Sequence, residues 1–303
     1  MQRLRLSPSG PEFSRIAFGT WRLLDDPEAA TPQGLLERLK VCLDLGITTI
    51  DTAEIYGLYR VEEVIGAALR LDAGVRSRME IVSKAGIYIP NDFHPDRKTA
   101  FYNTSAERLV KSVEKSLRFL GVEALDLFLV HRPDWLTRAE DTAEGLNRLL
   151  REGKIRSAGV SNYTPAQFRT LQAFTTAPLV TNQVQFSPFC LEPIFDGTFD
   201  QCQELHIHPM AWSPTGGGKL FREEDEKGQR LRAAMAGLSG KYNGATPDQL
   251  CYAWILSHGT RPLVVTGTNK ISRLRSLAAA DSIVLECEDW YALSEAARGR
   301  RIP

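Results

Sequence analysis

Short runs of apolar and β-branched residues alternate with longer amphipathic segments along almost the whole chain. The apolar runs predict eight β-strands, over residues 15–19, 47–50, 80–83, 126–130, 155–160, 180–186, 209–212 and 262–265. The amphipathic segments predict a helix after each strand, over residues 32–46, 61–71, 105–120, 140–151, 165–174, 199–205, 247–257 and 272–280. Thr31 is suited to cap the first helix, Pro32 opens it and Gly46 closes it.

This succession of strand–helix units predicts a parallel (β/α)8 barrel, an α/β fold also called a TIM barrel. The strands are apolar on both faces, as expected of parallel strands buried beneath helices. No linker-like change of composition interrupts residues 1–303, which we therefore expect to form a single domain. An open doubly wound sheet is the alternative, but the first strand-to-helix turn lacks the Gly-x-Gly-x-x-Gly pattern of that fold.

Four segments do not fit the repeat. Residues 1–13, with a turn at Ser7-Pro8-Ser9-Gly10, predict a β-hairpin that closes the bottom of the barrel. Residues 84–104 and 216–243 are predicted as long loops, and both leave from the carboxyl ends of strands, where barrel enzymes keep their active sites. Residues 288–303 predict one more helix, outside the barrel and near its mouth.

Composition and charge exclude several classes of protein. The chain is 43% hydrophobic and 24% charged, which is ordinary for a globular protein. Lys plus Arg and Asp plus Glu number 37 each, so the balance gives no electrostatic reason to expect binding to nucleic acid or to an anionic membrane. No apolar run approaches the length of a membrane span, and no signal peptide is evident, so we expect a cytoplasmic protein.

The spacing of the cysteines and histidines does not predict a metal site. The cysteines are odd in number, widely spaced and never arranged as Cys-x-x-Cys, which is typical of reduced thiols in a cytoplasmic protein. His206 and His208 have a spacing that zinc ligands can have, but they precede a strand at the barrel end that serves stability. With no third ligand evident, we expect neither a bound metal nor a catalytic thiol.

Four chemically active side chains lie at or just beyond the carboxyl ends of predicted strands. Asp51 and Tyr56 follow the second strand, Lys84 the third and His131 the fourth. A buried lysine held by an aspartate can lower the pKa of a nearby phenol, and a histidine can hydrogen-bond a substrate oxygen. The set therefore suits the reduction of a carbonyl group. Taken singly, Asp51 could be a helix cap, Tyr56 a core aromatic residue and Lys84 a surface lysine.

Six short motifs occur in order at these strand ends: Gly19-Thr20-Trp21, Asp51-Thr52-Ala53-Glu54-Ile55-Tyr56-Gly57, Leu129-Val130-His131-Arg132-Pro133-Asp134, Gly159-Val160-Ser161-Asn162-Tyr163, Asn182-Gln183 and Trp212-Ser213-Pro214. Together they resemble the aldo-keto reductase superfamily, in its bacterial oxidoreductase branch. The resemblance extends over nearly the whole chain. Each motif is weak alone, but six in the right order at the right strand ends are specific.

The resemblance implies a role for each strand-end residue. Tyr56 is expected to protonate the carbonyl oxygen as hydride arrives, and Lys84 to make that proton easier to give. Asp51 is expected to hold Lys84 by an ion pair, and His131 to orient the carbonyl. An aromatic substrate pocket is expected from Trp21, Tyr56, Tyr88, Phe93 and His131.

The resemblance also implies a nicotinamide cofactor. Ser161, Asn162 and Gln183 are expected to bind its carboxamide, and Trp212 to stack on its ring, where many relatives carry tyrosine. Glycines after the seventh strand allow backbone N–H groups close to the pyrophosphate, although they could also form a flexible hinge. The other cofactor contacts expected here are Gly19, Thr20, Trp21, Asp51, Ser213, Pro214, Gly216, Gly217 and Gly218.

The turn after the eighth strand is the expected site of the adenosine 2′-phosphate. It leads into a helix N-terminus, a favourable place for an anion. The residues that the resemblance assigns to it are Gly267, Thr268, Lys270 and Arg273. Many relatives carry a lysine at the position of Gly267, so one phosphate contact is missing. We therefore expect NADPH as the cofactor, with NADH possible.

These expectations describe an NADPH-dependent enzyme that reduces aldehydes or ketones, with a small-molecule carbonyl substrate of unknown identity and an unknown oligomeric state. The alternative is an NADPH-binding sensor or partner subunit in which turnover is incidental. A metal-dependent barrel hydrolase is a third possibility. It would need inward-facing ligands on several strands, and the chain offers only His131 and Asp51 in such places.

Overall fold

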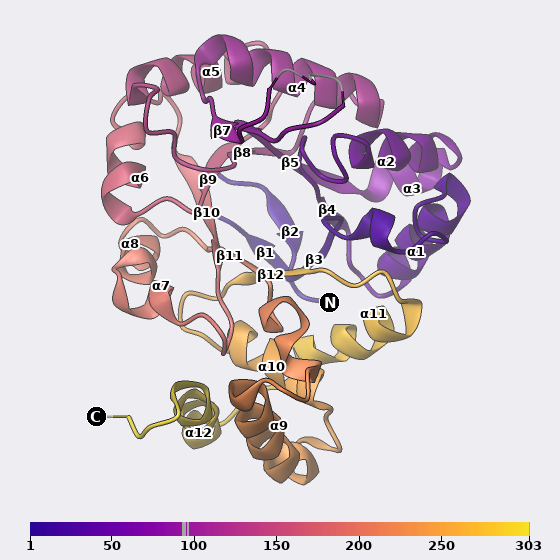
Figure 1. Cartoon of the computed structure of the whole chain (residues 1–303), viewed down its shortest axis with the longest axis vertical. Helices are drawn as coiled ribbons and strands as arrows, with labels where there is room; N and C mark the ends of the chain where they lie inside the picture. Colours follow the sequence, from indigo (N-terminus) through magenta and orange to yellow (C-terminus); the bar gives the residue numbers. More distant parts are fainter. Residues whose placement is uncertain (93–94, 96, 303) are drawn as a thin grey trace.

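The computed structural model of the chain describes residues 1–92, 95 and 97–302, and within them eight parallel strands close into a barrel (Figure 1). In pairing order, the last strand returning to the first, they are β3 (Ile16–Gly19), β4 (Thr49–Asp51), β5 (Glu80–Ala85), β8 (Leu127–Val130), β9 (Ala158–Ser161), β10 (Leu179–Gln185), β11 (Met210–Trp212) and β12 (Leu263–Thr266). Pairing of Val264 with Ile16 closes the barrel. The predicted (β/α)8 architecture is confirmed.

An outer ring of helices follows the strands in the predicted alternation. It consists of α1 (Pro32–Asp44), α2 (Val61–Arg70), α4 (Ala106–Leu120), α5 (Ala139–Arg151), α6 (Pro165–Gln172), α8 (Thr198–Glu204), α10 (Pro247–Leu256) and α11 (Ile271–Ala278). The Thr31 hydroxyl caps α1, since it accepts a hydrogen bond from the Gly34 N–H at 3.0 Å. Gly121 ends α4 with a φ of +69°, a left-handed conformation that glycine adopts at little cost.

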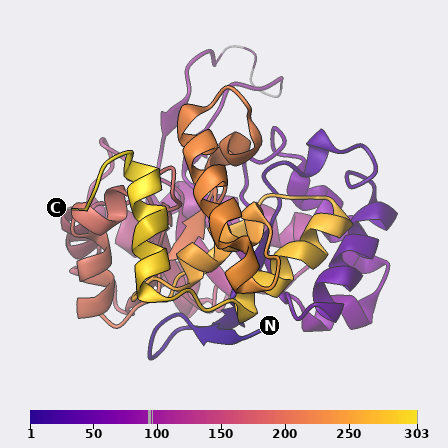
Figure 2. The same cartoon turned by 90° about the horizontal axis from the view of Figure 1, so that it is seen from below.

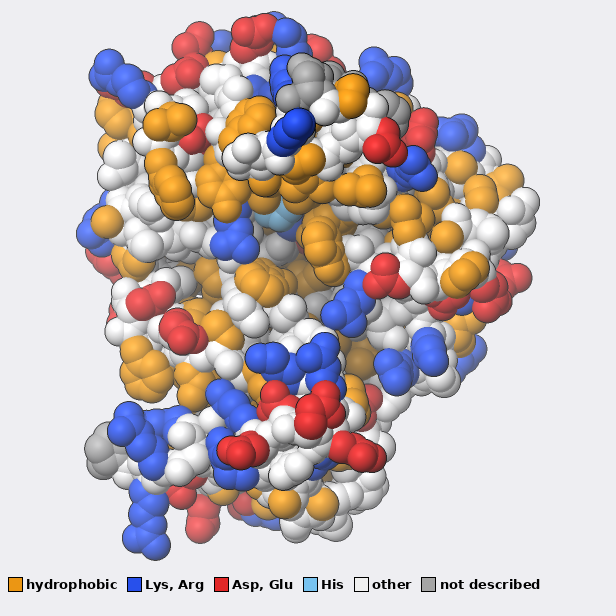
Figure 3. Space-filling view, in the orientation of Figure 1, with side chains coloured by type: hydrophobic (Ala, Val, Ile, Leu, Met, Phe, Trp, Pro, Cys, Tyr) orange, Lys and Arg blue, Asp and Glu red, His pale blue; other side chains and the backbone are white. Residues whose placement is uncertain are grey.

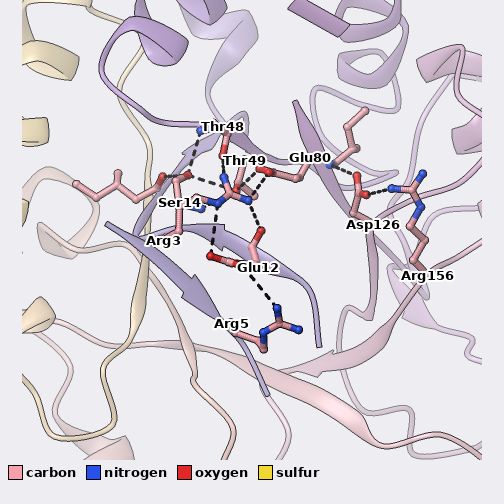
Figure 4. Close-up of polar contacts among 11 residues, drawn as sticks. Arg3, Arg5, Glu12, Ser14, Thr48, Thr49, Glu80, Asp126 and Arg156 are labelled. Atoms are coloured by element: carbon pink, nitrogen blue, oxygen red, sulfur yellow. Dashed lines mark hydrogen bonds and ion pairs between the residues drawn. The ribbon is translucent and has the colours of Figure 1, made fainter. Parts of the chain in front are cut away.

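The N-terminal hairpin closes the lower end of the barrel, as predicted (Figure 2). Its strands β1 (Arg3–Arg5) and β2 (Glu12–Ser14) are antiparallel. The Arg3 guanidinium donates to Thr48 Oγ1 at 2.8 Å and to a Glu80 carboxylate oxygen at 2.7 Å, which ties the hairpin to the starts of β4 and β5 (Figure 4). Three apolar side chains of the hairpin segment are buried in the barrel interior: Leu4, Leu6 and Phe13.

Several parts of the fold differ from their predicted bounds. Strand β9 begins at Ala158, not at residue 155, because Ile155 forms only an isolated bridge with Leu125. Residues 84–104 are not all loop, since β6 (Ile87–Tyr88) and β7 (Phe101–Tyr102) pair antiparallel within them. Short helices that the sequence pattern did not predict are η1 (Leu23–Asp25), α3 (Ala73–Arg78), α7 (Glu192–Phe195) and η4 (Ala279–Ser282).

The segment 216–243, predicted as a long loop, is largely helical. It contains η2 (Gly216–Phe221), α9 (Glu226–Ser239) and η3 (Gly240–Tyr242). The last helix, α12 (Cys287–Arg298), lies outside the barrel against α9, and its Trp290 stacks on Trp254 of α10 with ring centroids 4.9 Å apart (Figure 1). Its position outside the barrel was predicted. In the described part of the chain, each helix is too short or too polar to cross a membrane.

Candidate active site

A buried ion pair joins the ends of β4 and β5. Asp51 is the last residue of β4 and Lys84 lies near the end of β5, with only 2% and 1% of their surfaces exposed. Lys84 Nζ donates to Asp51 Oδ1 at 2.7 Å and to the Thr52 carbonyl oxygen at 2.8 Å. Burial lowers the pKa of the Lys84 ammonium, and the Asp51 carboxylate opposes that shift. The predicted pair is therefore present, inside the mouth of the barrel.

Tyr56 lies beside this ion pair. Lys84 Nζ is 5.3 Å from the centroid of the Tyr56 ring, and the Trp21 ring packs edge-on against it at 4.9 Å. Burial, reinforced by the charge of Asp51, raises the pKa of the Tyr56 phenol well above its ordinary value. The phenol therefore keeps its proton at neutral pH, which is the state that a proton donor needs.

A tight left-handed turn follows Tyr56. Gly57, Leu58 and Tyr59 have φ angles of +54°, +53° and +69°, a region that residues other than glycine adopt rarely. A Cβ at Gly57 would also approach Leu24 Cδ1 to 2.4 Å, so a side chain has no room there. The turn connects Tyr56 to α2 and fixes the direction in which the chain leaves the mouth.

His131 follows β8 and faces Tyr56. The two rings are edge-to-face, with centroids 6.0 Å apart. Burial and the charges of Lys84 and Arg132 lower the pKa of the His131 imidazole well below its ordinary value, so the ring is neutral at pH 7. Its Nδ1 is buried and has no hydrogen-bond partner within the described residues. A neutral imidazole offers one donor and one acceptor nitrogen, so His131 has hydrogen-bonding capacity left at the mouth.

The polar residues predicted to bind a carboxamide form one connected network. Ser161 Oγ donates to the Gln183 carbonyl oxygen at 2.9 Å, and Asn162 Nδ2 donates to Ser161 Oγ at 2.7 Å. Trp212 Nε1 donates to Asn162 Oδ1 at 3.1 Å. Gln183 Nε2 donates to Asp51 Oδ2 at 2.7 Å, a bond that the sequence did not predict. The network thus links the strand ends of β9, β10 and β11 to the Lys84–Asp51 pair.

Gly19, Thr20 and Trp21 lie at the end of β3. A Cβ at Gly19 would lie 2.3 Å from the Thr266 carbonyl oxygen, so glycine is what allows β3 and β12 to approach here. Thr20 Oγ1 donates to the Asp51 carbonyl oxygen at 3.0 Å. The Trp21 side chain is exposed at the rim, next to Tyr56.

The segment after β11 has an irregular backbone. Ser213 has a φ of +55°, and Pro214 is buried. Arg22 Nη2 donates to the Gly217 carbonyl oxygen at 3.2 Å, which joins this segment to the loop after β3. Left-handed φ angles of +63°, +68° and +92° occur at Gly216, Gly217 and Gly218. A Cβ at Gly216 would lie 2.5 Å from the Phe189 ring, so this turn requires glycine at its first position.

The turn after β12 is exposed and basic. Gly267 and Lys270 are exposed, and Thr268 Oγ1 accepts a hydrogen bond from the Lys270 N–H at 3.3 Å. Arg273 lies in the first turn of α11, with its guanidinium 5.8 Å from the ring centroid of Phe221 at the end of η2. The segments that follow β11 and β12 therefore meet at Arg273.

The predicted aromatic pocket is only partly assembled. Tyr88 lines a separate cavity outside the mouth, where its ring stacks on Phe101 at 4.7 Å, and Phe93 lies outside the described residues. Figure 3 shows a hollow at the centre of the mouth, with apolar side chains around it and a histidine visible inside. The predicted pocket residues that the structure brings together are Trp21, Tyr56 and His131.

Sequence reasoning missed a buried carboxyl group on α2, Glu62. It accepts hydrogen bonds from Ser83 Oγ at 2.6 Å and from Ser116 Oγ at 2.8 Å, and Ser83 precedes Lys84 on β5. Burial raises the pKa of Glu62 to about 7. The available signal was helical spacing, because Glu62 and Ile65 share the face of α2 that packs inward.

Comparison with known proteins places the chain in a family. A model of the Aldo/keto reductase family matches residues 15–298. The chain is 41% identical to Oxidoreductase YdhF of Escherichia coli K12 and 38% identical to the 6-dehydroglucose reductase of Agrobacterium fabrum, in both cases over 100% of each chain. Two solved structures are similar to it over nearly their full lengths.

The first is the glycerol dehydrogenase AKR11B4 from Gluconobacter oxydans, at 26% identity and a TM-score of 0.85, with 99% of this chain and 97% of that one covered. The second is the thermostable aldo-keto reductase Tm1743 in complex with the inhibitor epalrestat, at 27% identity and a TM-score of 0.81, with 98% and 100% covered. Fold, sequence and family match agree over the whole barrel. The chain belongs to the aldo-keto reductase family, and it is an NAD(P)H-dependent oxidoreductase.

Proposed function

We propose that this chain reduces aldehyde or ketone groups to alcohols with NADPH, with Tyr56 as the proton donor. The observation that carries the proposal is the buried Lys84–Asp51 pair directly beside a buried, protonated phenol. When bound, NADPH supplies the hydride that is added to the carbonyl carbon. The protein then has to deliver one proton to the carbonyl oxygen and to stabilise the charge that develops there.

Tyr56 supplies that proton. Its phenol is protonated at neutral pH, and the Lys84 ammonium near its ring stabilises the phenolate that forms as the proton leaves. Asp51 holds Lys84 in place through their hydrogen bond, although the charge of Asp51 itself disfavours the phenolate. His131, which is neutral, donates a hydrogen bond to the carbonyl oxygen and orients it.

The residues around the mouth fit a nicotinamide dinucleotide. Asn162 and Gln183 are amide side chains with one donor and one acceptor end each, the pair of groups that a carboxamide binds. Gly216, Gly217 and Gly218 form a left-handed turn without side chains, where a pyrophosphate can approach the backbone closely; the Gly216 and Gly218 N–H groups donate within the turn, to the Ser213 and Thr215 carbonyl oxygens. Arg273, an exposed guanidinium on the first turn of α11, would bind the 2′-phosphate that distinguishes NADPH from NADH.

The substrate class follows from chemistry and from the relatives. A rim formed by Trp21 and Tyr56 is apolar and accepts many carbonyl compounds. Relatives named 6-dehydroglucose reductase and glycerol dehydrogenase act, by their names, on polyhydroxylated compounds. Oxidised sugars and polyols therefore belong in the first substrate panel, beside simple aldehydes and ketones.

The decisive variant is Tyr56→Phe, which keeps the ring and removes the proton donor. We expect kcat for the best carbonyl substrate to fall by about 10²-fold or more, the scale of general acid catalysis, while NADPH affinity changes little. Tyr291→Phe, in the exposed part of α12, is the matched control and should behave like the wild type. Near-wild-type turnover of Tyr56→Phe would overturn the mechanism. Tight NADPH binding by the wild type without turnover of any carbonyl would favour the sensor alternative.

A further inference from the structure

A second cavity lies outside the barrel mouth, between α4, the β6–β7 ladder and the turn after Tyr56. Its volume is about 540 Å³, within the range of small-molecule sites. Figure 1 shows α2 and α4 side by side on this flank of the barrel. Glu54 and Tyr59, on either side of Tyr56 in the sequence, line the cavity, whereas the Tyr56 ring faces Trp21 and His131 in the mouth.

The walls of this outer cavity carry more positive charge than the neighbouring carboxylates balance. Arg108 is paired with Glu54 through two hydrogen bonds of 3.0 and 2.9 Å. Lys111, a second lining cation on α4, is paired with Glu107 one turn earlier in the same helix. The remaining cations have no carboxylate within ion-pair distance in the described part of the chain. They are Arg97, Lys115 and Arg118.

All three of these cations lie over aromatic rings. Lys115 Nζ is 5.0 Å from the ring centroid of Tyr59, and the Arg97 guanidinium is 5.3 Å from that of Tyr88. The Arg118 guanidinium is 5.5 Å from the ring centroid of Phe119. Cation–π contacts position a charge without neutralising it, so these groups remain able to bind an anion. Several converging cations in a concave space attract a dianion more strongly than a monoanion.

The cavity also offers an aromatic wall. Tyr88 and Phe101 stack with an interplanar angle of 22°, and Phe101 is 40% exposed, so part of this stacked pair is open to a ligand. An aromatic ring in the cavity can stack on it. We propose that this cavity binds a small aromatic phosphate, with its phosphate group held by Lys115, Arg118 and Arg97 and its ring against Phe101.

The site is distinct from the mouth, but it adjoins the loop that carries Tyr56. The Glu54 N–H donates to the Lys84 carbonyl oxygen at 2.9 Å, and Tyr59 Oη accepts a hydrogen bond from the Ile89 N–H at 3.1 Å. A ligand in the outer cavity therefore contacts the outer side of this loop. Because the carbonyl enters from the mouth, the aromatic phosphate is expected to bind without competing with it.

Titration calorimetry on the full chain tests this site directly. Saturating NADP⁺ keeps the cofactor's own phosphate site filled, and phenyl phosphate is the probe. We expect one saturable site in the wild type and at least tenfold weaker binding in the double variant Lys115→Gln/Arg118→Gln. The matched control is Arg148→Gln, an exposed arginine on the neighbouring helix α5, which should bind like the wild type. All three proteins should show the same carbonyl turnover without the probe.

Two further probes separate the contributions of charge and ring. Inorganic phosphate should bind more weakly than phenyl phosphate because it has no ring to place against Phe101, and phenol should not bind measurably. Equal affinity for phosphate and phenyl phosphate would overturn the aromatic part of the proposal. Unchanged affinity in Lys115→Gln/Arg118→Gln would overturn the site itself, as would competition between phenyl phosphate and the carbonyl substrate.

Discussion

Strand β5 carries a charged residue near each end, and the two residues differ in how deeply they are buried. Glu80, at the lower end, pairs with Arg3 of the hairpin, and the two side chains are partly exposed, Glu80 at 21% and Arg3 at 40% (Figure 4). Lys84, at the mouth, pairs with Asp51, and both are almost completely buried. Exposed pairs are worth little to stability, whereas buried pairs cost desolvation that their attraction barely offsets. The buried pair is therefore better explained by chemistry at the mouth than by folding.

The same contrast appears on the next strand. Below β8, Asp126 pairs with the exposed Arg156 and accepts a hydrogen bond from the Ile81 N–H at 2.8 Å. Above β8, His131 keeps a buried nitrogen without a partner in the described residues. An unpaired buried polar atom is a cost to the fold. On this strand the carboxylate at the lower end is fully paired, while His131 at the mouth keeps a buried nitrogen without a partner. Elsewhere at the lower end, Ser7 Oγ and Arg15 Nε are also buried without a partner in the described residues, so the contrast holds for β8 and not for the whole barrel.

The largest expected effect comes from breaking the buried pair. Lys84→Met should abolish carbonyl turnover and lower the free energy of unfolding by about 3–5 kcal/mol, because the Asp51 carboxylate stays buried without its cation. The double variant Asp51→Asn/Lys84→Met removes both charges and should recover most of the stability but none of the turnover. Urea unfolding and steady-state kinetics measure the two effects. A double variant as unstable as Lys84→Met would mean that the pair stabilises the fold.

Substitution of Arg273 tests whether an exposed charge at the mouth can contribute as much to function, through cofactor binding, as the buried charge pair does. Its contact within the protein is the Phe221 ring, so its loss should hardly change stability. We expect Arg273→Ala to weaken NADPH binding by roughly tenfold to a few hundredfold, equivalent to about 1.5–3 kcal/mol for one charged contact. NADH has no 2′-phosphate and should bind almost as before. Fluorescence titration with each cofactor is the measurement, and equal weakening of both would give Arg273 a role in supporting the loop.

Glu62 is a buried carboxyl on the outer side of β5, held by two serine hydroxyls. Its pKa is raised from the ordinary 4.5 to about 7, so the folded chain binds this proton more tightly than the unfolded chain does. The stability it contributes is present below about pH 4.5 and is lost as the pH rises through 7. The free energy of unfolding of the wild type, relative to that of Glu62→Gln, should therefore fall by about 1–3 kcal/mol between pH 5 and 8. A constant difference across this range would show that Glu62 does not titrate there.

These comparisons also show what the sequence could predict. Asp51, Lys84 and His131 were found because each follows a short apolar strand, and a closed parallel barrel brings all such positions to one end. The barrel itself was predictable from the repeated alternation of apolar runs and helices. Helix α9 was missed although Leu231 and Met235 have helical spacing, because few of its residues are buried.

Cross-strand partners were not predictable. The Gln183–Asp51 hydrogen bond joins residues more than a hundred positions apart, and it depends on how the barrel closes. Glu62 reads as a solvated helix residue unless its register against β5 is known. Tyr88 was assigned to the mouth because its loop leaves from a strand end, but alternation of side chains within β6 places its ring in the outer cavity. In each case the missing information is the direction of a side chain, which periodicity alone does not give.

The smallest effect is expected at the lower end of the barrel. Arg156→Ala removes an exposed ion pair and should change the free energy of unfolding by no more than about 1 kcal/mol, with turnover unchanged. Asp126→Ala should cost more, about 1–3 kcal/mol, because it also leaves the N–H of the buried Ile81 without its acceptor. Asp126→Asn retains an acceptor oxygen and separates the two effects, since it loses the charge and can keep the hydrogen bond. If Arg156→Ala destabilised the chain as strongly as Lys84→Met, charge pairs would have the same role at both ends of the barrel.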